Sequence, residues 1–329
     1  MTFLENLFAV SEKVGLLFIL IAVGFMCQRI KLLTEEANKC MADIVMYIVT
    51  PCVIIHAFSA TLYSKSELLS ILKNIGIVAL ISVIAHVVMI LTVMAVFRIH
   101  NEAKRRVVRF AAVFSNAGFI ALPLAQALID SPTSHEGALY AAVYLAVFNI
   151  VLWTWGYADM SGDKSSIRVY KLLFNPGIIG VVLGLIIFTS PLYVSFGESA
   201  GIRLPSLIAD AISAMSALNL PLPMLMVGYY LGKANLIAAF RDGWSYLCIV
   251  MRLILFPLVL LGVLYVCGVR GNVLIVSVIG ACAPVGATAT IFSAKFGHDT
   301  DLSVRLVSLS TVFSMLSMPL IIGLTQMLA

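Results

Sequence analysis

Ten long apolar runs follow one another along this 329-residue chain. A helix needs about 20 apolar residues to cross a bilayer, and backbone inside lipid favours helices because they satisfy their own hydrogen bonds. The runs therefore predict an all-α integral membrane protein with ten transmembrane helices. The predicted spans are residues 7–29, 35–60, 71–98, 104–130, 136–158, 175–192, 205–232, 237–267, 272–296 and 300–328.

The amino-acid composition leaves too few charges to cover a surface in contact with water. Hydrophobic residues make up 61% of the chain and charged residues 11%, whereas soluble domains carry about 45–50% and about 25%. This excludes a soluble enzyme, a nucleic-acid-binding protein and a disordered chain, and it makes the lipid bilayer the expected surroundings. The sequence has no Walker A loop, dinucleotide-binding fingerprint, HExxH motif or zinc-ligand spacing, so we expect neither a cofactor nor a metal.

Local signals mark several predicted helix ends. Thr34 precedes two glutamates, a pattern typical of an N-cap followed by an acidic first turn. Asn175 and Pro176 open the sixth run, since proline suits the first position of a helix. Gly268 and Gly297 are expected to end the eighth and ninth helices.

Lysine and arginine are spread unevenly over the connections between the runs. The odd-numbered connections hold fourteen of them and the opposite side holds five. Because cytoplasmic loops of membrane proteins are enriched in lysine and arginine, we expect the odd-numbered connections in the cytoplasm. The chain is then a multi-pass protein of the plasma (inner) membrane with both termini on the non-cytoplasmic side.

The two halves of the chain share features at a nearly constant spacing, which indicates an internal repeat. Five spans in each half is an odd number, so the second half would be inverted, as in many secondary transporters. We expect a first five-helix repeat at residues 1–158, a polar cytoplasmic linker at 159–174 and a second, inverted repeat at 175–329. Chance similarity between apolar helices is the alternative. The matched pairs, 165 to 167 residues apart, are Ala146–Asn149 with Thr311–Ser314, Asp43 with Asp210, and His86 with Arg252.

Proline, glycine and asparagine interrupt the fourth and ninth runs at corresponding places. Asn116, Gly118 and Pro123 lie in the fourth run, and Pro284 and Gly286 lie in the ninth. Because proline removes a backbone donor and glycine adds backbone freedom, both helices should unwind near mid-membrane. Such backbone is tolerated only against protein or a water-filled cavity, and the N-terminus of each second half-helix would attract an anion. A plain proline kink that serves packing is the alternative for each break.

Short segments spread along the chain carry a resemblance to a known family. They are Tyr47–Pro51, Ser115–Phe119 with Leu122 and Pro123, Ala283 with Pro284, and Lys295–Gly297 followed by a serine-rich last span with Pro319. Together they resemble the auxin efflux carrier family, which has bacterial members and includes the plant PIN carriers. The resemblance implies ten helices in two inverted repeats, with broken crossover helices 4 and 9. It also implies a scaffold of spans 1, 2, 6 and 7, and a transport unit of spans 3–5 and 8–10.

The same resemblance implies a substrate site where spans 4 and 9 cross. The family's crossing positions map onto residues 116–123 and 284–288, and its polar position in span 5 maps onto Asn149. Asn116 would bind the substrate together with exposed backbone amides and half-helix N-termini. Hydrogen bonding between helices is the alternative role for the polar side chains. The candidate substrate-binding residues are Asn116, Gly118, Pro123, Asn149, Pro284, Gly286, Thr288 and Arg252.

Four ionisable residues inside the predicted spans are candidates for electrostatic roles. Arg252 lies well inside span 8, where a charge is costly unless it is paired or hydrated. It would attract an anion, or else pair with Asp43 or Asp210, or snorkel toward the cytoplasm. His86 lies in the middle of span 3 and could exchange a proton near neutral pH, although a hydrogen-bonded core histidine is the alternative. Asp43 and Asp210 could bind a proton or sodium if they lie deep in the membrane.

Two small-xxx-small patterns, Gly180–Gly184 and Gly228–Gly232, lie in spans 6 and 7. Small residues at this spacing let helix backbones approach closely. The patterns predict either packing within the scaffold or a homodimer through helices 6 and 7.

These features predict a secondary transporter that moves a small organic anion by alternating access. The alternatives are an ion-coupled symporter of another small solute, using H+ or Na+, and a sensor or channel on the same fold. An intramembrane serine hydrolase has one motif in its support, Gly197–Gly201, which matches G-x-S-x-G. That motif requires a strand before the serine and a helix after it. Here it lies in a connection between two predicted spans, so we do not expect an enzyme.

Overall fold

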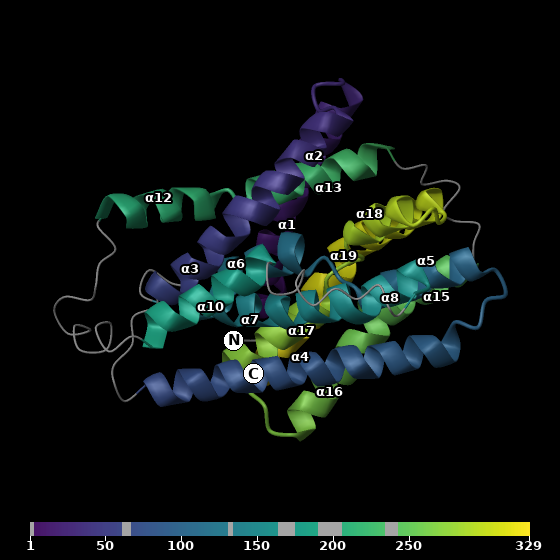
Figure 1. Ribbon diagram of the computed structural model, residues 1–329. Coiled ribbons are helices and arrows are strands. Elements are labelled where there is room, and N and C mark those ends of the chain that lie inside the picture. Colours follow the sequence, from purple (N-terminus) through teal and green to yellow (C-terminus); the bar gives the residue numbers. More distant parts are fainter. Residues whose placement is uncertain (1–2, 61–66, 131–133, 164–174, 190–205, 234–242) are drawn as a thin grey trace.

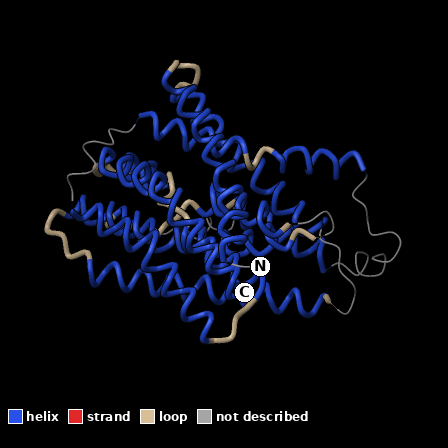
Figure 2. The backbone as a smooth tube through the Cα atoms, turned by 180° about the vertical axis from the view of Figure 1, so that it is seen from behind, coloured by secondary structure: helices blue, strands red, loops and turns tan. Residues whose placement is uncertain are grey.

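The computed structural model describes residues 3–60, 67–130, 134–163, 175–189, 206–233 and 243–329. Within these residues every regular element is a helix, apart from one isolated bridge between two extended segments. Figure 1 and Figure 2 show the helices from opposite sides. The predicted all-α class is confirmed for this part of the chain. The G-x-S-x-G segment and most of the central linker lie outside the described residues.

Seven helical stretches are long and apolar enough to cross a membrane, and three shorter apolar helices accompany them in the described part. Every predicted span contains one of these stretches, as expected of a multi-pass membrane protein. The number of crossings and the inverted repeat stay predictions. The long stretches are Phe3–Arg29, Glu35–Ser59, Leu68–Val96, Glu136–Ser161, Leu207–Lys233, Gly243–Val266 and Thr300–Leu328, and the shorter ones are Ala117–Ile129, Pro176–Thr189 and Gly271–Cys282.

Several long stretches are made of shorter α-helices joined by single π-helical turns at Val45–Val49, Leu152–Gly156 and Met251–Leu255. Prolines follow two of these turns closely, at positions where the missing backbone donor disturbs regular winding. The α-helices are α1 (Phe3–Arg29), α2 (Glu35–Ile44), α3 (Thr50–Ala60), α4 (Leu68–Val96), α5 (Glu102–Val113), α6 (Leu122–Ile129), α7 (Glu136–Val151), α8 (Tyr157–Ser161), α10 (Pro176–Thr189), α12 (Ser206–Ala217), α13 (Pro221–Lys233), α15 (Gly243–Val250), α16 (Phe256–Val266), α17 (Gly271–Cys282), α18 (Thr288–Lys295) and α19 (Thr300–Leu328).

The local signals at the helix ends are confirmed. Thr34 accepts a hydrogen bond at 3.2 Å from the amide three residues later. Asn175 accepts one at 2.9 Å from the second residue of α10. Gly268 and Gly297 have φ of 77° and 68°, the left-handed backbone that glycine adopts without strain at the end of a helix.

Glycines bring two pairs of helices into close contact, α1 with α13 and α3 with α10. A Cβ at Gly228 would lie 2.6 Å from the Phe25 amide nitrogen, and one at Gly184 would meet the Phe58 ring. The other glycine of each pattern faces α1 or α3 in the same way. Both small-xxx-small patterns therefore serve packing inside this chain, which is one of their two predicted roles. A homodimer through helices 6 and 7 stays a prediction.

The two ends of the chain lie near each other, as the N and C marks in Figure 1 show. Gly323 of α19 packs directly against the backbone of Leu7 in α1. The Ala329 carbonyl accepts a hydrogen bond from the Gly271 amide at 3.2 Å. Both termini therefore lie at the same end of the bundle, as an even number of crossings requires. Which side of the membrane this is stays a prediction.

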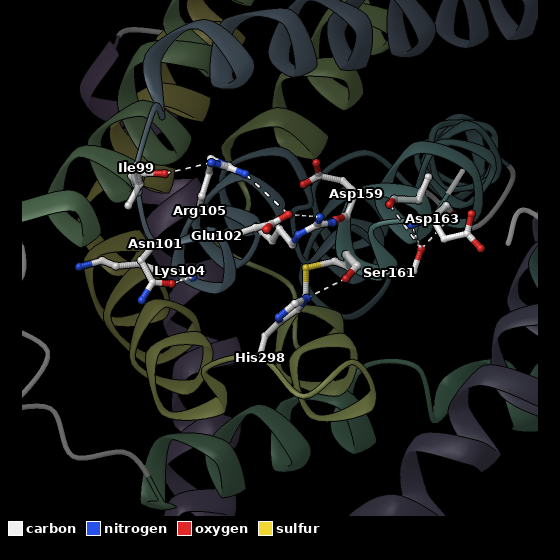
Figure 3. A network of polar contacts seen from close by, with 12 residues as sticks. Ile99, Asn101, Glu102, Lys104, Arg105, Asp159, Ser161, Asp163 and His298 are labelled. Carbon is white, nitrogen blue, oxygen red and sulfur yellow. Dashed lines mark hydrogen bonds and ion pairs between the residues drawn. The ribbon is translucent and has the colours of Figure 1, made fainter. Parts of the chain in front are cut away.

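A polar network joins the beginning of α5 to the end of α8 and to the α18–α19 connection (Figure 3). Arg106 donates to the Asp159 carbonyl oxygen and to the Glu102 carboxylate, and His298 Nε2 lies 2.7 Å from the Met160 carbonyl oxygen. The hydrogen bond from Arg106 lowers the pKa of the Glu102 carboxyl. The network connects three segments that are predicted to face the cytoplasm.

Replacing Gly24 by alanine should weaken the contact between α1 and α13, because the added Cβ would collide with the Leu225 backbone. Overpacked sites lose about 1–3 kcal/mol, so the midpoint of thermal unfolding in detergent should fall. Gly15 lies in the same helix with nothing within 4 Å of its Cβ position, and Gly15→Ala is the matched control. An unchanged midpoint for Gly24→Ala, or an equal fall for Gly15→Ala, would contradict this close contact.

Candidate functional site

The fourth and ninth predicted spans are both interrupted in the structure. α5 ends before residues 114–116, and a π-helical turn at Ala117–Ala121 then leads into α6. Residues 283–287 separate α17 from α18. Phe114 and Ala283, the first residues after α5 and α17, both have extended backbone. The interruptions fall on the segments that proline, glycine and asparagine mark in the sequence.

The two breaks lie against each other and exchange backbone hydrogen bonds. The Asn116 amide donates to the Pro284 carbonyl at 2.7 Å, and the Gly286 amide donates to the Phe114 carbonyl at 3.0 Å. These bonds flank a short antiparallel bridge between the two segments. A Cβ at Gly286 would lie 2.8 Å from the Ser115 carbonyl oxygen, so glycine permits the close approach. The unwound backbone thus finds partners away from lipid, as membrane proteins require.

The Arg252 side chain joins the C-terminal ends of α5 and α17. It is 0% exposed, and it donates to the carbonyls of Ala283 and Gly280 at 3.2 Å each, Val113 at 3.1 Å and Ala112 at 3.5 Å. The last carbonyls of a helix have no partner inside the helix and carry the negative end of its dipole. A buried cation is therefore stabilised between the two helix ends, without an acidic partner among these contacts.

Four buried polar groups near the crossing have no hydrogen-bond partner among the described residues. They are Nδ2 of Asn116, Oγ of Ser115, Oγ1 of Thr288 and the hydroxyl of Tyr144. The Tyr144 ring lies on Gly280 of α17, where an added Cβ would be 2.5 Å from the ring carbon Cζ. Buried polar side chains are almost always hydrogen-bonded. Their concentration here therefore indicates a place where a polar ligand group can bind.

A crevice too narrow to hold a water molecule lies beside the crossing, between α6, α7 and α17. Small apolar side chains form most of its wall. Pockets for small molecules usually measure about 300–1,000 Å³, whereas this crevice has no room for water, so a substrate would need this region to open. The residues that line it are Ala117, Ala121, Ala125, Ala141, Tyr144, Val276, Ile279 and Gly280.

Three further candidate residues lie beside the crossing or at its edge. Gly118 follows the break directly and meets the Leu145 side chain of α7, and Pro123 is buried in α6. The Asn149 side chain donates to the Leu145 carbonyl at 2.9 Å. Its amide nitrogen lies 3.4 Å from the Cβ position of Gly177 at the start of α10. Asn149 thus lies where α7 meets α10, outside the hydrogen-bonded bridge.

The three residues considered for ion coupling differ in their surroundings. His86 is fully buried in α4, with Nδ1 2.7 Å from the Ser82 carbonyl oxygen and its ring centroid 5.6 Å from that of Tyr144. Its Nε2 has no hydrogen-bond partner among the described residues. Asp43 in α2 and Asp210 in α12 are exposed. The structure thus brings His86 next to the crossing and leaves the two acids on helix surfaces.

Sequence reasoning missed Tyr144. It lies in a long apolar run in which an aromatic residue is expected to be core, and no motif surrounds it. The one available signal was its hydroxyl, since a tyrosine buried in a membrane helix needs a polar partner.

Comparisons with known proteins cover almost the whole chain. A family model described as membrane transport protein matches residues 9–322. An uncharacterized transporter from Methanocaldococcus jannaschii is 24% identical over 93% of this chain and 95% of its own length. Another, from Methanothermobacter thermautotrophicus, is 25% identical over 94% and 96%. Auxin efflux carrier component 1 of Arabidopsis thaliana is 28% identical over 150 residues, which cover 44% of this chain and 22% of the plant protein.

Removing the Arg252 side chain should destabilise the crossing. Arg252→Ala leaves the carbonyls at the ends of α5 and α17 without their donor, and an unsatisfied buried group costs about 1–3 kcal/mol. We expect a loss of at least about 3 kcal/mol, measured as a lower midpoint of thermal unfolding in detergent. Arg270→Ala is the control, because that arginine is exposed and donates only to carbonyls of the adjacent turn. Equal midpoints of thermal unfolding for the two variants would show that the crossing is stable without the Arg252 side chain.

Proposed function

The chain belongs to the membrane transport protein family, and we propose that it is a secondary transporter that moves a small organic anion across the membrane by alternating access. Membership places the chain among membrane transporters related to the auxin efflux carriers. The substrate class, the site and the mechanism are the proposal.

The observation that carries the proposal is the crossing of two broken helices beside unpartnered polar side chains. Many secondary transporters bind their substrate where interrupted helices meet near the middle of the membrane. Here Nδ2 of Asn116 and the hydroxyls of Thr288 and Tyr144 lie at or beside such a crossing without a hydrogen-bond partner in the described part of the chain. These groups supply hydrogen bonds for a small polar ligand.

The charge around the crossing favours an anion. Segments 114–123 and 283–290 contain no acidic residue, and Arg252 places a buried positive charge beside them. α18 begins at the crossing and so does the π-helical turn before α6. Unpaired amides and the positive end of a helix dipole attract negative charge at such positions. We propose that a carboxylate or similar group binds there, through Asn116, Thr288 and backbone amides near Gly286.

For the transport step we propose that a transport unit moves against a scaffold. The close glycine contacts of α1 with α13 and of α3 with α10 support a rigid scaffold. The hydrogen bonds at the crossing and the contacts of Arg252 join α5, α17 and the π-helical turn at Met251–Leu255, which supports their movement as one body. The crevice beside Tyr144 would widen when the site opens to one side.

The driving force in this proposal is a proton or sodium gradient, or the membrane potential acting on the charged substrate. His86 is a candidate for proton exchange because it is buried beside Tyr144. We also propose a plasma-membrane location with both termini on the non-cytoplasmic side, on the distribution of lysine and arginine. A homodimer through helices 6 and 7 would have to use faces other than those of the packed glycines.

Transport by purified protein in proteoliposomes tests this proposal. A panel of small organic anions, with pH, sodium and potential gradients imposed separately, should reveal saturable uptake and counterflow. Asn116→Ala should lower the rate about tenfold or more, because a hydrogen bond to a charged group is worth about 1.5–3 kcal/mol. Asn272→Ala is the control, since Asn272 donates to Glu136 at 2.7 Å and takes no part in the bridge.

Three outcomes would contradict the proposal at different points. Flux that never saturates would identify a channel. Saturable flux of cations or neutral solutes, with none of anions, would refute the proposal that the substrate is an organic anion. Full anion flux in the Asn116→Ala variant would show that the substrate binds away from the crossing.

A further inference from the structure

Two histidines and an aspartate form a cluster where the proposed scaffold meets the proposed transport unit. His56 lies in α3, His135 occupies the N-cap position of α7, and Asp130 occupies the C-cap position of α6. The two imidazole centroids are 5.1 Å apart, and His135 Nδ1 lies 3.5 Å from Asp130 Oδ2. The three residues are separate from the bridge that joins the two breaks.

We propose that His56, His135 and Asp130 form a proton-binding site, and that its second proton weakens the contact between scaffold and transport unit at this end of the molecule. The inference rests on the proposed function, because the two moving units are part of that proposal. The site would respond to acid on the side of the membrane that it faces.

One carboxylate balances one positive charge in this cluster. Asp130 Oδ1 accepts a hydrogen bond from the Ala138 amide, in the first turn of α7, at 3.1 Å. The positive end of the α7 dipole stabilises a negative charge at that place. Oδ2 of the same carboxylate faces His135. A proton on His135 therefore forms an ion pair, and the cluster as a whole remains neutral.

A second proton meets no further carboxylate in the cluster. A charged His56 would face a charged His135 at ring-contact distance, and like charges about 5 Å apart repel each other. His56 belongs to α3, whereas His135 is fixed to α7 and Asp130. The repulsion therefore acts across the boundary between the two proposed units. Histidine is the side chain whose charge is most readily changed by acid near physiological pH.

The elements packed on α3 add little charge around His56. α10 contains no titratable residue, and α12 contains Asp210, which is exposed. Within α3 itself, Cys52 precedes His56 by four residues, and Tyr47 lies in the preceding π-helical turn with an exposed side chain.

α7 contributes groups that already have partners or lie elsewhere along the helix. The Glu136 carboxylate accepts a hydrogen bond from Asn272, and the Tyr140 hydroxyl accepts one from Asn74. Tyr144 lies about two helical turns after Glu136, beside the crossing. Within the described ranges, no group of three or more histidine, cysteine or acidic side chains is placed to hold a metal ion. Two imidazoles and a carboxylate in contact are groups that can bind protons.

Protons from water can reach the cluster without passing through the crossing. The side chains of His135 and Asp130 are 21% and 12% exposed. They adjoin the connection between α6 and α7, which the distribution of lysine and arginine places on the non-cytoplasmic side. The site thus senses the pH outside the cytoplasm.

Hydrogen–deuterium exchange of the full chain in lipid nanodiscs tests the inference, at about pH 7.5 and about pH 5.5. After correction for the intrinsic effect of pH on exchange, amides at residues 50–60 and 136–142 should exchange about three- to tenfold faster in acid. His56→Gln should abolish that difference, because glutamine cannot take the second proton. His100→Gln is the matched control, since His100 is exposed in the connection before α5, and it should keep the full difference.

Two further variants guard against an effect of misfolding. His56→Phe keeps a ring in contact with His135 but cannot be protonated, and it should behave like His56→Gln. His135→Gln removes the other proton site and should also abolish the acid response. An acid response of wild-type size in any of these three variants would overturn the proposal, as would its absence in the unmodified chain.

The exchange experiment needs no substrate, so it separates this inference from the proposed function. Saturable anion flux that depends on Asn116, together with an unchanged acid response in His56→Gln, would refute the proton site alone. Loss of the acid response in His56→Gln, in a chain that transports no anion, would refute the proposed function and leave the proton site in place.

Discussion

Breaking a helix inside a membrane frees backbone groups that lipid cannot satisfy, and this requirement organises the centre of the molecule. The two breaks satisfy each other through the Asn116–Pro284 and Gly286–Phe114 hydrogen bonds. Arg252 donates hydrogen bonds to carbonyls at the ends of both α5 and α17. Neither break is complete without the other, because each supplies the other's partners. The half-helices are therefore coupled mechanically even without a bound substrate.

The same arrangement divides the polar groups of the crossing into two sets. Backbone amides and carbonyls are paired across the bridge, while Nδ2 of Asn116 and the hydroxyls of Thr288 and Tyr144 have no hydrogen-bond partner among the residues that the structure describes. Arg252 donates hydrogen bonds to carbonyls at the helix ends. An anion bound among the side-chain groups of the crossing would feel the positive charge of Arg252 without forming a direct ion pair. In the proposed mechanism such a site would attract a substrate and still release it, which a carrier needs as much as binding.

Local chemistry explains which parts of this site the sequence could predict. Proline and glycine act on their own backbone, so the breaks at Asn116 and Pro284 and the ends at Gly268 and Gly297 could be placed from neighbouring residues alone. The partners of Arg252 could not be predicted, because every residue has a carbonyl and two of the four partners lie more than a hundred residues away in α5. Tyr144 was missed for a similar reason: its neighbourhood is created by the packing of α7 on α17.

In the proposed mechanism, a site for a coupling proton must meet two physical demands. The histidines of this chain meet them to different degrees. The proton must reach water in at least one state, and its binding must differ in free energy between the states. Asp43 and Asp210 are exposed on the surfaces of helices, away from the boundary between the two proposed units. His86 is sealed beside Tyr144 and would need the crossing to open first. His56 and His135 meet across the proposed moving boundary with part of their surface accessible. The free energy of a charge at this boundary changes whenever the two proposed units shift. A proton bound there therefore meets both demands, whereas His86 meets them only after the crossing opens.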